Sequence, residues 1–371
     1  MITDGHFFFA GGGTGGHIYP AIAVASALMR LRPEAKVHFF CSSRAIDSRI
    51  LKEGGYDFTP LPARAFSVRP DRFLQFLAMY YRSVRVVKAM LADKRPAVLV
   101  GIGGFASAPA VTAAGKLGVP VAMLNVDMVP GKANRVMAKK ASKVFVQWED
   151  TAKYLGKTNA QIIASGCPLR EGFGKADRAA VLGSLGLDAG RKTLLITGGS
   201  SGAQNVNRAV CTCVTRMNEF SGSWQVVHVT GPGIAEVKRA YEGAKITHKV
   251  LEYHHAMPEL MSSADIVVGR AGAVSVAEYA AAGVAAIMLP YPYHKDQHQR
   301  LNAQRLIEAG GGVIVEDRPN EPEKTASELW ENLSALMAGG QKVVKMSAAA
   351  RSLGRPDAAD RIAAELVSMM A

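Results

Sequence analysis

The stretch HFFFAGGGTGGHIYP, residues 6–20, decides the fold. It joins a short apolar strand over 6–10 to a loop with five glycines, and the loop ends at His17, where a helix begins near Ile18. Glycine lets backbone N–H groups approach an anion closely, and a helix N-terminus carries a partial positive charge. We therefore interpret the loop as a phosphate cradle, with the titratable side chain of His17 at its rim.

The glycine spacing of this loop does not by itself identify a dinucleotide site. Gly11, Gly13 and Gly16 satisfy G-x-G-x-x-G. The acidic residue expected about 20 residues further on, at the end of the second strand, is missing. The second strand, 36–41, ends in Cys-Ser-Ser-Arg instead. A nicotinamide-dependent dehydrogenase is therefore disfavoured.

Length and composition indicate two globular domains. The chain has 371 residues, 49% of them hydrophobic, and 37 glycines, which suits α/β layers with many tight turns. The first residues lack the features of a signal peptide, and no apolar run approaches the ~20 residues of a spanning helix, so we expect a cytoplasmic protein. Four scattered cysteines predict neither disulfides nor zinc, and we expect no metal or other cofactor.

Positive charge is concentrated in the first half of the chain. Residues 1–167 carry 22 Lys and Arg against 10 Asp and Glu, whereas residues 168–371 carry 22 against 21. A field of one sign draws a domain towards a polyanion or an anionic membrane surface. The imbalance therefore predicts that the first half makes such a contact.

Both halves have the same alternation of strands and helices. Continuous apolar runs, typical of parallel strands covered on both faces, occur at 6–10, 37–41, 97–101, 119–124 and 143–147, and again at 193–197, 224–230, 249–253, 264–269 and 285–290. Each half begins with a strand, a glycine turn and a helix. We predict two Rossmann-like domains facing a cleft, over 1–167 and 168–354, joined near 166–173. The final helix, within 355–371, is expected to pack on the first domain.

A second glycine turn, GIGGFASAP at 101–109, follows another strand of the first half. Gly103 and Gly104 are expected to bring backbone N–H groups to the same sheet edge as the first loop. Two adjacent anion cradles suggest a diphosphate ligand. The alternative is that both are simply tight turns between a strand and a helix.

The segment 66–91 has an amphipathic helical pattern. Apolar residues recur at helical spacing, namely Phe73, Leu77, Tyr80, Val84, Val87 and Leu91, with Leu74, Phe76 and Tyr81 widening the surface. Cationic residues flank it at Arg69, Arg72, Arg82, Arg85 and Lys88. Such a helix can lie in a membrane interface. The alternative is a helix that packs between elements of the domain.

In the second half, the stretch GRAGAVSVAEYAAAGVAAIMLPYPYHKDQHQRLNA, 269–303, combines several polar signals. A glycine turn opens a helix with Ser275 and Glu278, and a following loop carries polar residues at His294, Asp296, His298 and Gln299. Ser275 and Glu278 have the spacing of a helix-capping box. A glutamate also binds a ribose diol and a glutamine binds sugar hydroxyls, so a nucleotide sugar fits this region.

Together these motifs resemble one family. The segments GGGTGGHIYPAIAVA, GIGGFASAP, VPGKANR, GCPLR, TGGSSGAQNVN, GRAGAVSVAEYAAAG and PYPYHKDQHQRLNA, in this order over about residues 6–316, are similar to the MurG family of UDP-N-acetylglucosamine:N-acetylmuramyl-(pentapeptide) pyrophosphoryl-undecaprenol N-acetylglucosamine transferases. The resemblance implies the two-domain glycosyltransferase B fold. It also implies peptidoglycan synthesis at the cytoplasmic face of the cell membrane, with the protein bound peripherally.

The resemblance further implies roles for individual residues. The acceptor's diphosphate and reacting sugar fall to Thr14, Gly15, Gly16, His17, Gly103 and Gly104. The UDP-sugar falls to Arg170, Ser200, the backbone near His254, Ala273, Val274, Ser275, Glu278 and Gln299, with Thr14, Gly15, Gly16 and Asp127 also near it. The 4-hydroxyl of a lipid-linked N-acetylmuramic acid would attack C1 of the donor sugar, invert it and expel UDP, with no obligatory metal. His17 is the candidate general base, and its alternative role is a hydrogen bond to the acceptor phosphate.

One segment departs from the family pattern. The family usually has His-Glu-Gln-Asn before VPGKANR, whereas this chain has Leu124, Asn125, Val126 and Asp127. Asp127 is therefore a second candidate base, or the acceptor differs in this branch.

Two other functions are weighed against this one. The first is a related glycosyltransferase that acts on another lipid, such as diacylglycerol. The second is a non-catalytic basic protein, which would leave Glu278 and Gln299 unexplained. The expected partners are UDP-N-acetylglucosamine, a polyprenyl-diphosphate-linked muramyl peptide and an anionic membrane surface, with no nucleic acid.

Overall fold

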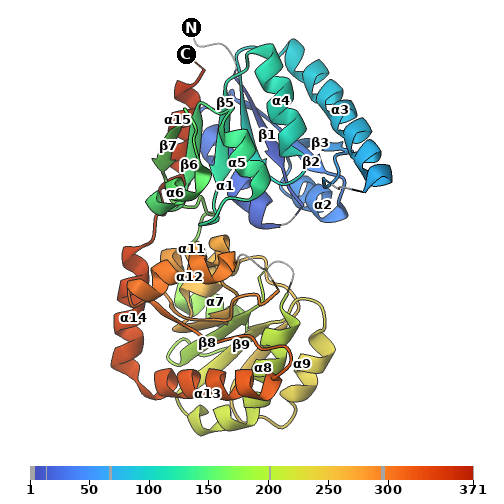
Figure 1. Ribbon diagram of the computed structural model, residues 1–371. Helices are drawn as coiled ribbons and strands as arrows, with labels where there is room; N and C mark the ends of the chain where they lie inside the picture. Colours follow the sequence, from blue (N-terminus) through green and yellow to red (C-terminus); the bar gives the residue numbers. More distant parts are fainter. Residues whose placement is uncertain (1–4, 14, 67–68, 200–201, 294–296, 371) are drawn as a thin grey trace. The chain divides into compact units, whose positions relative to one another are not determined.

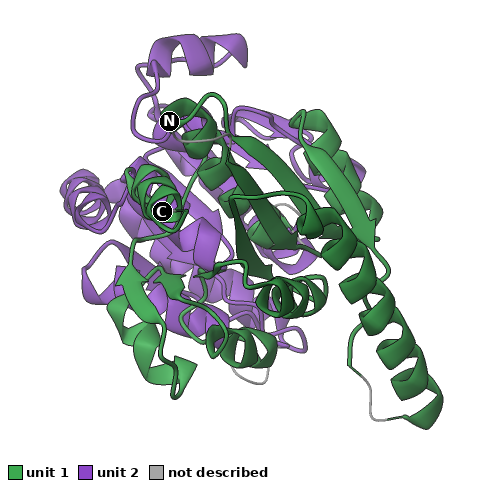
Figure 2. Cartoon of the chain, turned by 90° about the horizontal axis from the view of Figure 1, so that it is seen from above, with its two compact units in different colours: residues 1–170, 357–371 green, residues 171–356 purple. Residues whose placement is uncertain are grey.

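The computed structural model describes residues 5–13, 15–66, 69–199, 202–293 and 297–370. The chain forms two compact units, which Figure 2 shows in different colours. Unit 1 contains residues 1–170 and 357–371, and unit 2 contains residues 171–356. The chain therefore leaves unit 1, builds unit 2, and returns to unit 1 for its last helix.

Unit 1 is built on a seven-stranded parallel sheet in the order β3-β2-β1-β4-β5-β6-β7 (Figure 1). Its central strands are almost wholly buried, as a parallel sheet covered by helices on both faces requires. The strands are β1 (His6–Gly11), β2 (Lys36–Ser42), β3 (Asp57–Leu61), β4 (Ala97–Gly103), β5 (Val121–Asn125), β6 (Lys143–Val146) and β7 (Gln161–Ala164).

Helices cover this sheet, and the last helix of the chain lies against the first. The helices are α1 (Gly15–Leu31), α2 (Ala45–Glu53), α3 (Pro70–Ala92), α4 (Ser107–Leu117), α5 (Lys132–Ala138), the 3-10 turn Glu149–Thr151, α6 (Ala152–Leu155) and α15 (Ala358–Ser368). The α15 helix packs on α1 and adds two ion pairs, from Arg30 to Asp360 at 2.8 Å and from Lys143 to Glu365 at 2.5 Å.

Unit 2 repeats the plan with a six-stranded parallel sheet in the order β10-β9-β8-β11-β12-β13. Its strands are β8 (Lys192–Thr197), β9 (Trp224–Val229), β10 (Thr247–Leu251), β11 (Ile266–Gly269), β12 (Ala285–Met288) and β13 (Gly312–Ile314). Its helices are α7 (Arg178–Ser184), α8 (Gln204–Met217), α9 (Ile234–Ala240), α10 (Met257–Ser262), α11 (Ala273–Ala282), α12 (His298–Glu308), α13 (Pro322–Ala338) and α14 (Gly340–Ser352), with a 3-10 turn at Asn218–Phe220.

The two sheets share a topological feature that locates ligand sites. In unit 1 the strand order reverses between β1 and β4, and in unit 2 it reverses between β8 and β11. In open parallel sheets, ligands bind beyond the carboxyl ends of the strands at such a reversal. We therefore expect ligand-binding and catalytic residues at the glycine turns that follow these four strands.

The helix predicted within 66–91 is confirmed as α3, and its two halves have different environments. Towards its end, Val84, Val87 and Leu91 are buried in the core of unit 1. Towards its start, Leu74 and Tyr81 keep more than 60% of their surface exposed. Packing against the domain thus explains the buried residues of the second half and Tyr80, whose hydroxyl lies 2.6 Å from the Thr112 hydroxyl, but not the exposed Leu74 and Tyr81. Among the described helices, none is both long and apolar enough to cross a membrane.

Candidate functional site

The two glycine turns of unit 1 interlock. The amide of Gly12 donates to the carbonyl of Gly103 at 3.2 Å, and Gly11, Gly12, Gly103 and Gly104 all have positive φ. A Cβ added to Gly104 would lie 2.3 Å from the Gly12 oxygen, and one added to Gly11 would lie 2.2 Å from the Gly103 oxygen. Steric contact between the turns therefore requires glycine at positions 11 and 104, whether or not an anion binds.

A buried carboxylate, that of Asp47, accepts hydrogen bonds from the first glycine turn. Asp47, at the start of α2, is fully buried and accepts the Gly13 amide at 2.8 and 3.1 Å, and also the amide and hydroxyl of Ser42. Arg44 donates to the Gly13 carbonyl at 2.7 Å. The amides of Gly12 and Gly13 thus have partners within the protein. Of the predicted phosphate cradle, the amides that remain for an anion are those of the first turn of α1, beginning at Gly15 and Gly16.

His17 and Asp127 line one pocket at this edge of unit 1. The pocket is enclosed by both residues together with Gly16, Pro20, Ile102, Leu124, Asn125, Val126 and Asn134. Burial lowers the pKa of His17, and the negative charges of Asp127 and Asp47 oppose that shift. Burial therefore favours the neutral imidazole, which has one nitrogen able to accept a proton.

The segment that departs from the family pattern is held by an asparagine pair. Asn125, at the end of β5, donates to the Asp127 carbonyl at 2.7 Å and accepts the side-chain amide of Asn134 at 2.9 Å. Leu124, Asn125 and Val126 are buried, whereas Asp127 is only partly buried. Of these four positions, Asp127 is the one whose side chain is both ionisable and reachable from the pocket.

Sequence reasoning missed Asp47 and Asn134. Asp47 follows β2 by five residues, beyond the place where a ribose-binding acid is expected. Its signal is an acidic residue in the first turn of the short helix that follows β2. Asn134 belongs to the motif VPGKANR and lies on α5. The sequence signal that could have identified it is its polar amide side chain within that motif.

In unit 2, α11 begins at the strand-order reversal, after β11. The helix begins at Ala273 after Gly272, which makes no side-chain capping bond. Ser275 is therefore the third helical residue and not the cap, so a capping box does not explain Ser275 and Glu278. The first-turn amides of Ala273, Val274 and Ser275 remain as donors for an anion, with Glu278 one turn later.

A hydrogen bond from the start of the β12–α12 connection reaches Gln299, which lies on α12. The side-chain oxygen of Gln299 accepts the Tyr291 amide at 2.9 Å. Gln297, just before α12, has a φ of 47°, a left-handed conformation that costs roughly 1–2 kcal/mol for a residue other than glycine. His298 opens α12, while His294 and Asp296 lie outside the described residues.

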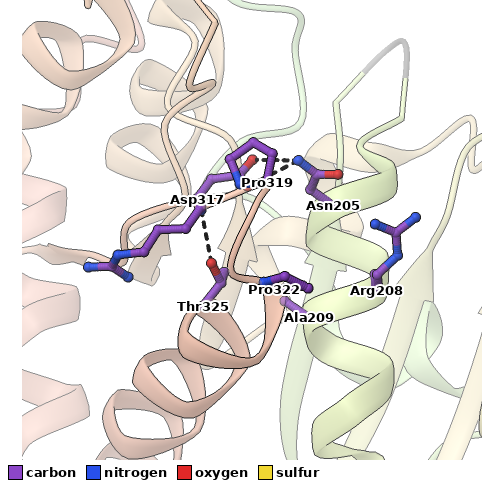
Figure 3. A pocket seen from close by; sticks show the side chains of 8 residues that line it. Asn205, Arg208, Ala209, Asp317, Pro319, Pro322 and Thr325 are labelled. Carbon is purple, nitrogen blue, oxygen red and sulfur yellow. Dashed lines mark hydrogen bonds between the residues drawn. The ribbon is translucent and has the colours of Figure 1, made fainter.

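A buried ion pair supports this connection. The Arg270 guanidinium, after β11, lies 2.7 Å from the Asp317 carboxylate, and Asp317 also accepts the Asn205 amide at 3.1 Å. Figure 3 shows Asn205 on α8 directed towards Asp317, which lies in the segment before α13. Arg270 donates to the Leu289 carbonyl at 3.0 Å as well. The pair thus links α8, β11 and the end of β12.

The remaining predicted residues lie as follows. The Arg170 guanidinium stacks 4.6 Å from the ring centre of Tyr19, on α1 of the same unit. His254 is partly buried, and burial together with the neighbouring His255 lowers its pKa. Thr14 and Ser200 lie outside the described residues. Cys211 and Cys213 lie on α8, and no group of metal-ligating side chains is found within the described ranges.

Comparison with known proteins agrees with this geometry. Residues 7–146 match the glycosyltransferase family 28 N-terminal domain and residues 193–362 match its C-terminal domain. A protein from Clavibacter michiganensis is 36% identical over 96% of this chain and 94% of its own length. A protein from Desulfitobacterium hafniense is 31% identical over 95% and 96%. Both are named UDP-N-acetylglucosamine–N-acetylmuramyl-(pentapeptide) pyrophosphoryl-undecaprenol N-acetylglucosamine transferase.

A solved structure extends the similarity to the fold. The crystal structure of MurG from Acinetobacter baumannii is 25% identical, with a TM-score of 0.72 over 98% of this chain and 99% of that one. The predicted two-domain glycosyltransferase B fold is confirmed by this similarity and by the two parallel sheets. The chain therefore belongs to the MurG family, the UDP-N-acetylglucosamine-dependent glycosyltransferases of peptidoglycan synthesis.

Proposed function

We propose that this protein transfers N-acetylglucosamine from UDP-N-acetylglucosamine to undecaprenyl-diphospho-N-acetylmuramoyl-pentapeptide. The acceptor's 4-hydroxyl oxygen forms a bond to C1 of the donor sugar while the bond from C1 to the diphosphate oxygen breaks, with inversion at C1. UDP leaves with the electron pair, and the hydroxyl proton passes to a base. The observation that carries the proposal is the pairing of His17 with Asp127 at a pocket in unit 1, within a chain of this family.

We assign the general base to His17. Burial lowers its pKa and so favours the neutral imidazole, the form that accepts a proton. The charge of Asp127 favours the imidazolium that forms when the hydroxyl proton arrives. Asp127 is the alternative base, because its carboxylate lines the same pocket. The amides of Gly15 and Gly16, with Gly103 and Gly104, are assigned to the acceptor's diphosphate and reacting sugar.

The donor is assigned to the carboxyl edge of the sheet in unit 2. The first-turn amides of Ala273, Val274 and Ser275 suit the diphosphate, since they lie at the positive end of α11. Glu278 is assigned to the ribose diol and Gln299 to the sugar hydroxyls. The same donor role is proposed for Arg170, for Ser200 and for the backbone near His254, with Thr14 near both substrates. As the bond to C1 breaks, the helix N-terminus stabilises charge on the leaving diphosphate.

The exposed face of α3 is assigned to the membrane surface. Phe66, Phe73, Phe76, Tyr80 and Tyr81 form a chain of ring contacts with centroids 5.5 to 6.5 Å apart. The exposed side chains of Arg82, Arg85 and Lys88 follow along the same helix, which extends outward from unit 1 in Figure 2. Of these rings, Phe66, Phe73 and Tyr81 are exposed, and exposed aromatics with adjacent cations suit an interface of anionic lipid. Because the acceptor's polyprenyl chain stays in the bilayer, the enzyme must work at that surface.

An acceptor panel tests the function. The purified protein is incubated with UDP-N-acetylglucosamine and, in separate reactions, with the lipid-linked muramyl pentapeptide, its sugar-free polyprenyl diphosphate, or diacylglycerol. Of the three reactions, UDP release is expected only in the one that contains the lipid-linked muramyl pentapeptide. Turnover with diacylglycerol and not with the muramyl lipid would replace the proposal with the alternative lipid glycosyltransferase, and UDP release with none of the acceptors would contradict both.

A further inference from the structure

The Arg270–Asp317 ion pair is almost completely removed from water. The Arg270 side chain is 11% exposed and the Asp317 side chain is 2% exposed. Asp317 has two partners, Arg270 at 2.7 Å and Asn205 at 3.1 and 3.3 Å. Figure 3 shows the second contact at the wall of a small pocket between α8 and the segment before α13. Asp317, itself bonded to Asn205, thus holds the guanidinium on one side.

On its other side, Arg270 contacts the segment 289–291, which in turn bonds to Gln299 on α12. The Nη1 of Arg270 that meets Asp317 also donates to the Leu289 carbonyl at 3.0 Å, and the guanidinium lies 5.6 Å from the ring centre of Tyr291. The amide of Tyr291 in turn donates to the Oε1 of Gln299 at 2.9 Å. A continuous set of contacts therefore runs from Asp317 through Arg270 to the backbone at 289–291 and on to Gln299.

The last contact decides which end of the Gln299 amide is presented to a ligand. A backbone N–H can only donate, so the group that faces Tyr291 must be the carbonyl oxygen of the side chain. The NH₂ group points away from it and has no hydrogen-bond partner in the part of the chain that the structure describes. Gln299 therefore presents a donor, which suits a hydroxyl or carbonyl oxygen of a sugar.

We propose that Asp317 and Asn205 are positioning residues for the sugar half of the donor site. They fix Arg270, which fixes the backbone at Leu289 and Tyr291, which orients the Gln299 amide. The inference rests on the proposed function, because it takes Gln299 as a contact to the donor sugar. Neither Asp317 nor Asn205 touches the donor in this arrangement.

The chemistry of the pair favours positioning over simple stabilisation. Burying two charges costs much of what their attraction returns, so well-packed apolar residues would stabilise the fold at least as well. An ion pair instead imposes a fixed direction, since a guanidinium has donors in a planar fork. The pair also sits where the strand order reverses and not in the centre of the core. Direction at this edge matters for a ligand and not for packing.

The test compares binding of UDP-N-acetylglucosamine with binding of UDP. Asp317→Asn keeps the shape and removes the charge. We expect it to raise the KM for UDP-N-acetylglucosamine about five- to tenfold, the effect of one misplaced hydrogen bond. The inhibition constant of UDP is expected to stay within twofold, because Gln299 is assigned to the sugar. Asn205→Ala is expected to act in the same direction with a smaller effect, and Asp317→Glu is expected to restore part of the loss.

Glu328→Gln is the matched control. It removes another ion pair, between Arg318 and Glu328, near the same pocket without touching Arg270. Its KM for the donor is expected to equal that of the wild type. In a Gln299→Ala background, Asp317→Asn is expected to add nothing further, because the two changes act through one contact. Circular dichroism checks that each variant is folded, and Asn205→Ala carries the test if Asp317→Asn does not fold.

Three results would overturn the inference. An unchanged donor KM in Asp317→Asn, with a raised one in Gln299→Ala, would reject positioning and leave the proposed function intact. Equal weakening of UDP and of UDP-N-acetylglucosamine would place the effect on the nucleotide and not on the sugar. An unchanged donor KM in Gln299→Ala would remove the assigned donor contact, and with it both the inference and that part of the proposed function.

Discussion

The carboxyl edges of the two sheets have the same topology but carry different chemistry. In unit 1, the edge gathers ionisable groups, with His17 and Asp127 at one pocket and Asp47 buried beneath the glycine turn. In unit 2, the edge gathers groups that bind by hydrogen bonds, with the start of α11, the Glu278 carboxylate and the Gln299 amide, and the charges of Arg270 and Asp317 cancel. One fold used twice thus provides one edge suited to proton transfer and another suited to recognition.

The glycine turns of the two units also differ, in the backbone that each turn packs against. In unit 1, the turns after β1 and β4 pack on each other, so each constrains the other. In unit 2, the turn after β8 packs on its own continuation, since a Cβ on Gly198 would lie 2.2 Å from the Ala203 amide nitrogen. A glycine-rich sequence therefore indicates close backbone approach in both units, but the neighbouring group that is approached differs.

The largest effect is expected from His17→Ala. Positioned proton transfer is worth roughly 10²- to 10⁴-fold, so turnover should fall by about that factor. The affinity for UDP should stay nearly unchanged, because the donor is assigned to unit 2. Steady-state kinetics and calorimetry with UDP measure the two quantities. Asp127→Asn is the matched control: if it costs far more turnover than His17→Ala, the general base is Asp127.

The next largest effect is expected on membrane binding, which is assigned to the surface of unit 1 and not to that of unit 2. Changing Arg82, Arg85 and Lys88 to Glu should abolish sedimentation with anionic vesicles, since each basic residue near such a surface contributes about 1 kcal/mol. Raised salt should weaken wild-type binding. Activity towards a short-chain, water-soluble acceptor should survive.

The control for this experiment reverses three exposed cations of unit 2, Lys238, Arg239 and Lys245. This variant should sediment like the wild type, because the excess positive charge lies in residues 1–167. Vesicle binding that ignores both the α3 reversal and the salt would leave α3 with a packing role alone.

Recognition in unit 2 is tested by Glu278→Ala. If Glu278 binds the ribose diol, the variant loses charge-assisted hydrogen bonds worth roughly 1.5–3 kcal/mol, and UDP affinity falls about 10- to 150-fold. Calorimetry with UDP measures this loss, with the exposed helical Glu331→Ala as control. A folded Glu278→Ala with wild-type UDP affinity would remove Glu278 from the site.

Sequence patterns predicted the buried strands of this fold and missed three of its four edge strands. All ten predicted strands are present, whereas β3, β7 and β13 were not predicted. These three lie at sheet edges and have few fully buried residues, so they lack the continuous apolar run of a central strand. An apolar pattern reports burial, and edge strands are held mainly by backbone hydrogen bonds that the pattern does not encode.

The candidate site shows the same limit. His17 and Glu278 follow glycine turns and could be found from local sequence. Asp47 and Asn134 act through contacts to residues 34 and nine positions away in the chain, so no local pattern predicts them. The Arg270–Asp317 pair spans 47 positions. Residues that position others depend on tertiary contacts, whereas residues beside glycine turns are marked by the turn itself.

The smallest effect, on pH dependence, tests whether His17 and Asp127 act together. A base must be unprotonated, so kcat/KM falls as the pH drops through the pKa of His17, which burial places below its usual 6.5. The charge of Asp127 raises that pKa, so Asp127→Asn should lower it further and move the acidic limb of the profile to lower pH. A pH profile of kcat/KM for both proteins measures the shift. A limb that stays in place or moves to higher pH would show that the Asp127 charge does not act on the base, and the ionisable groups of unit 1 would then work independently.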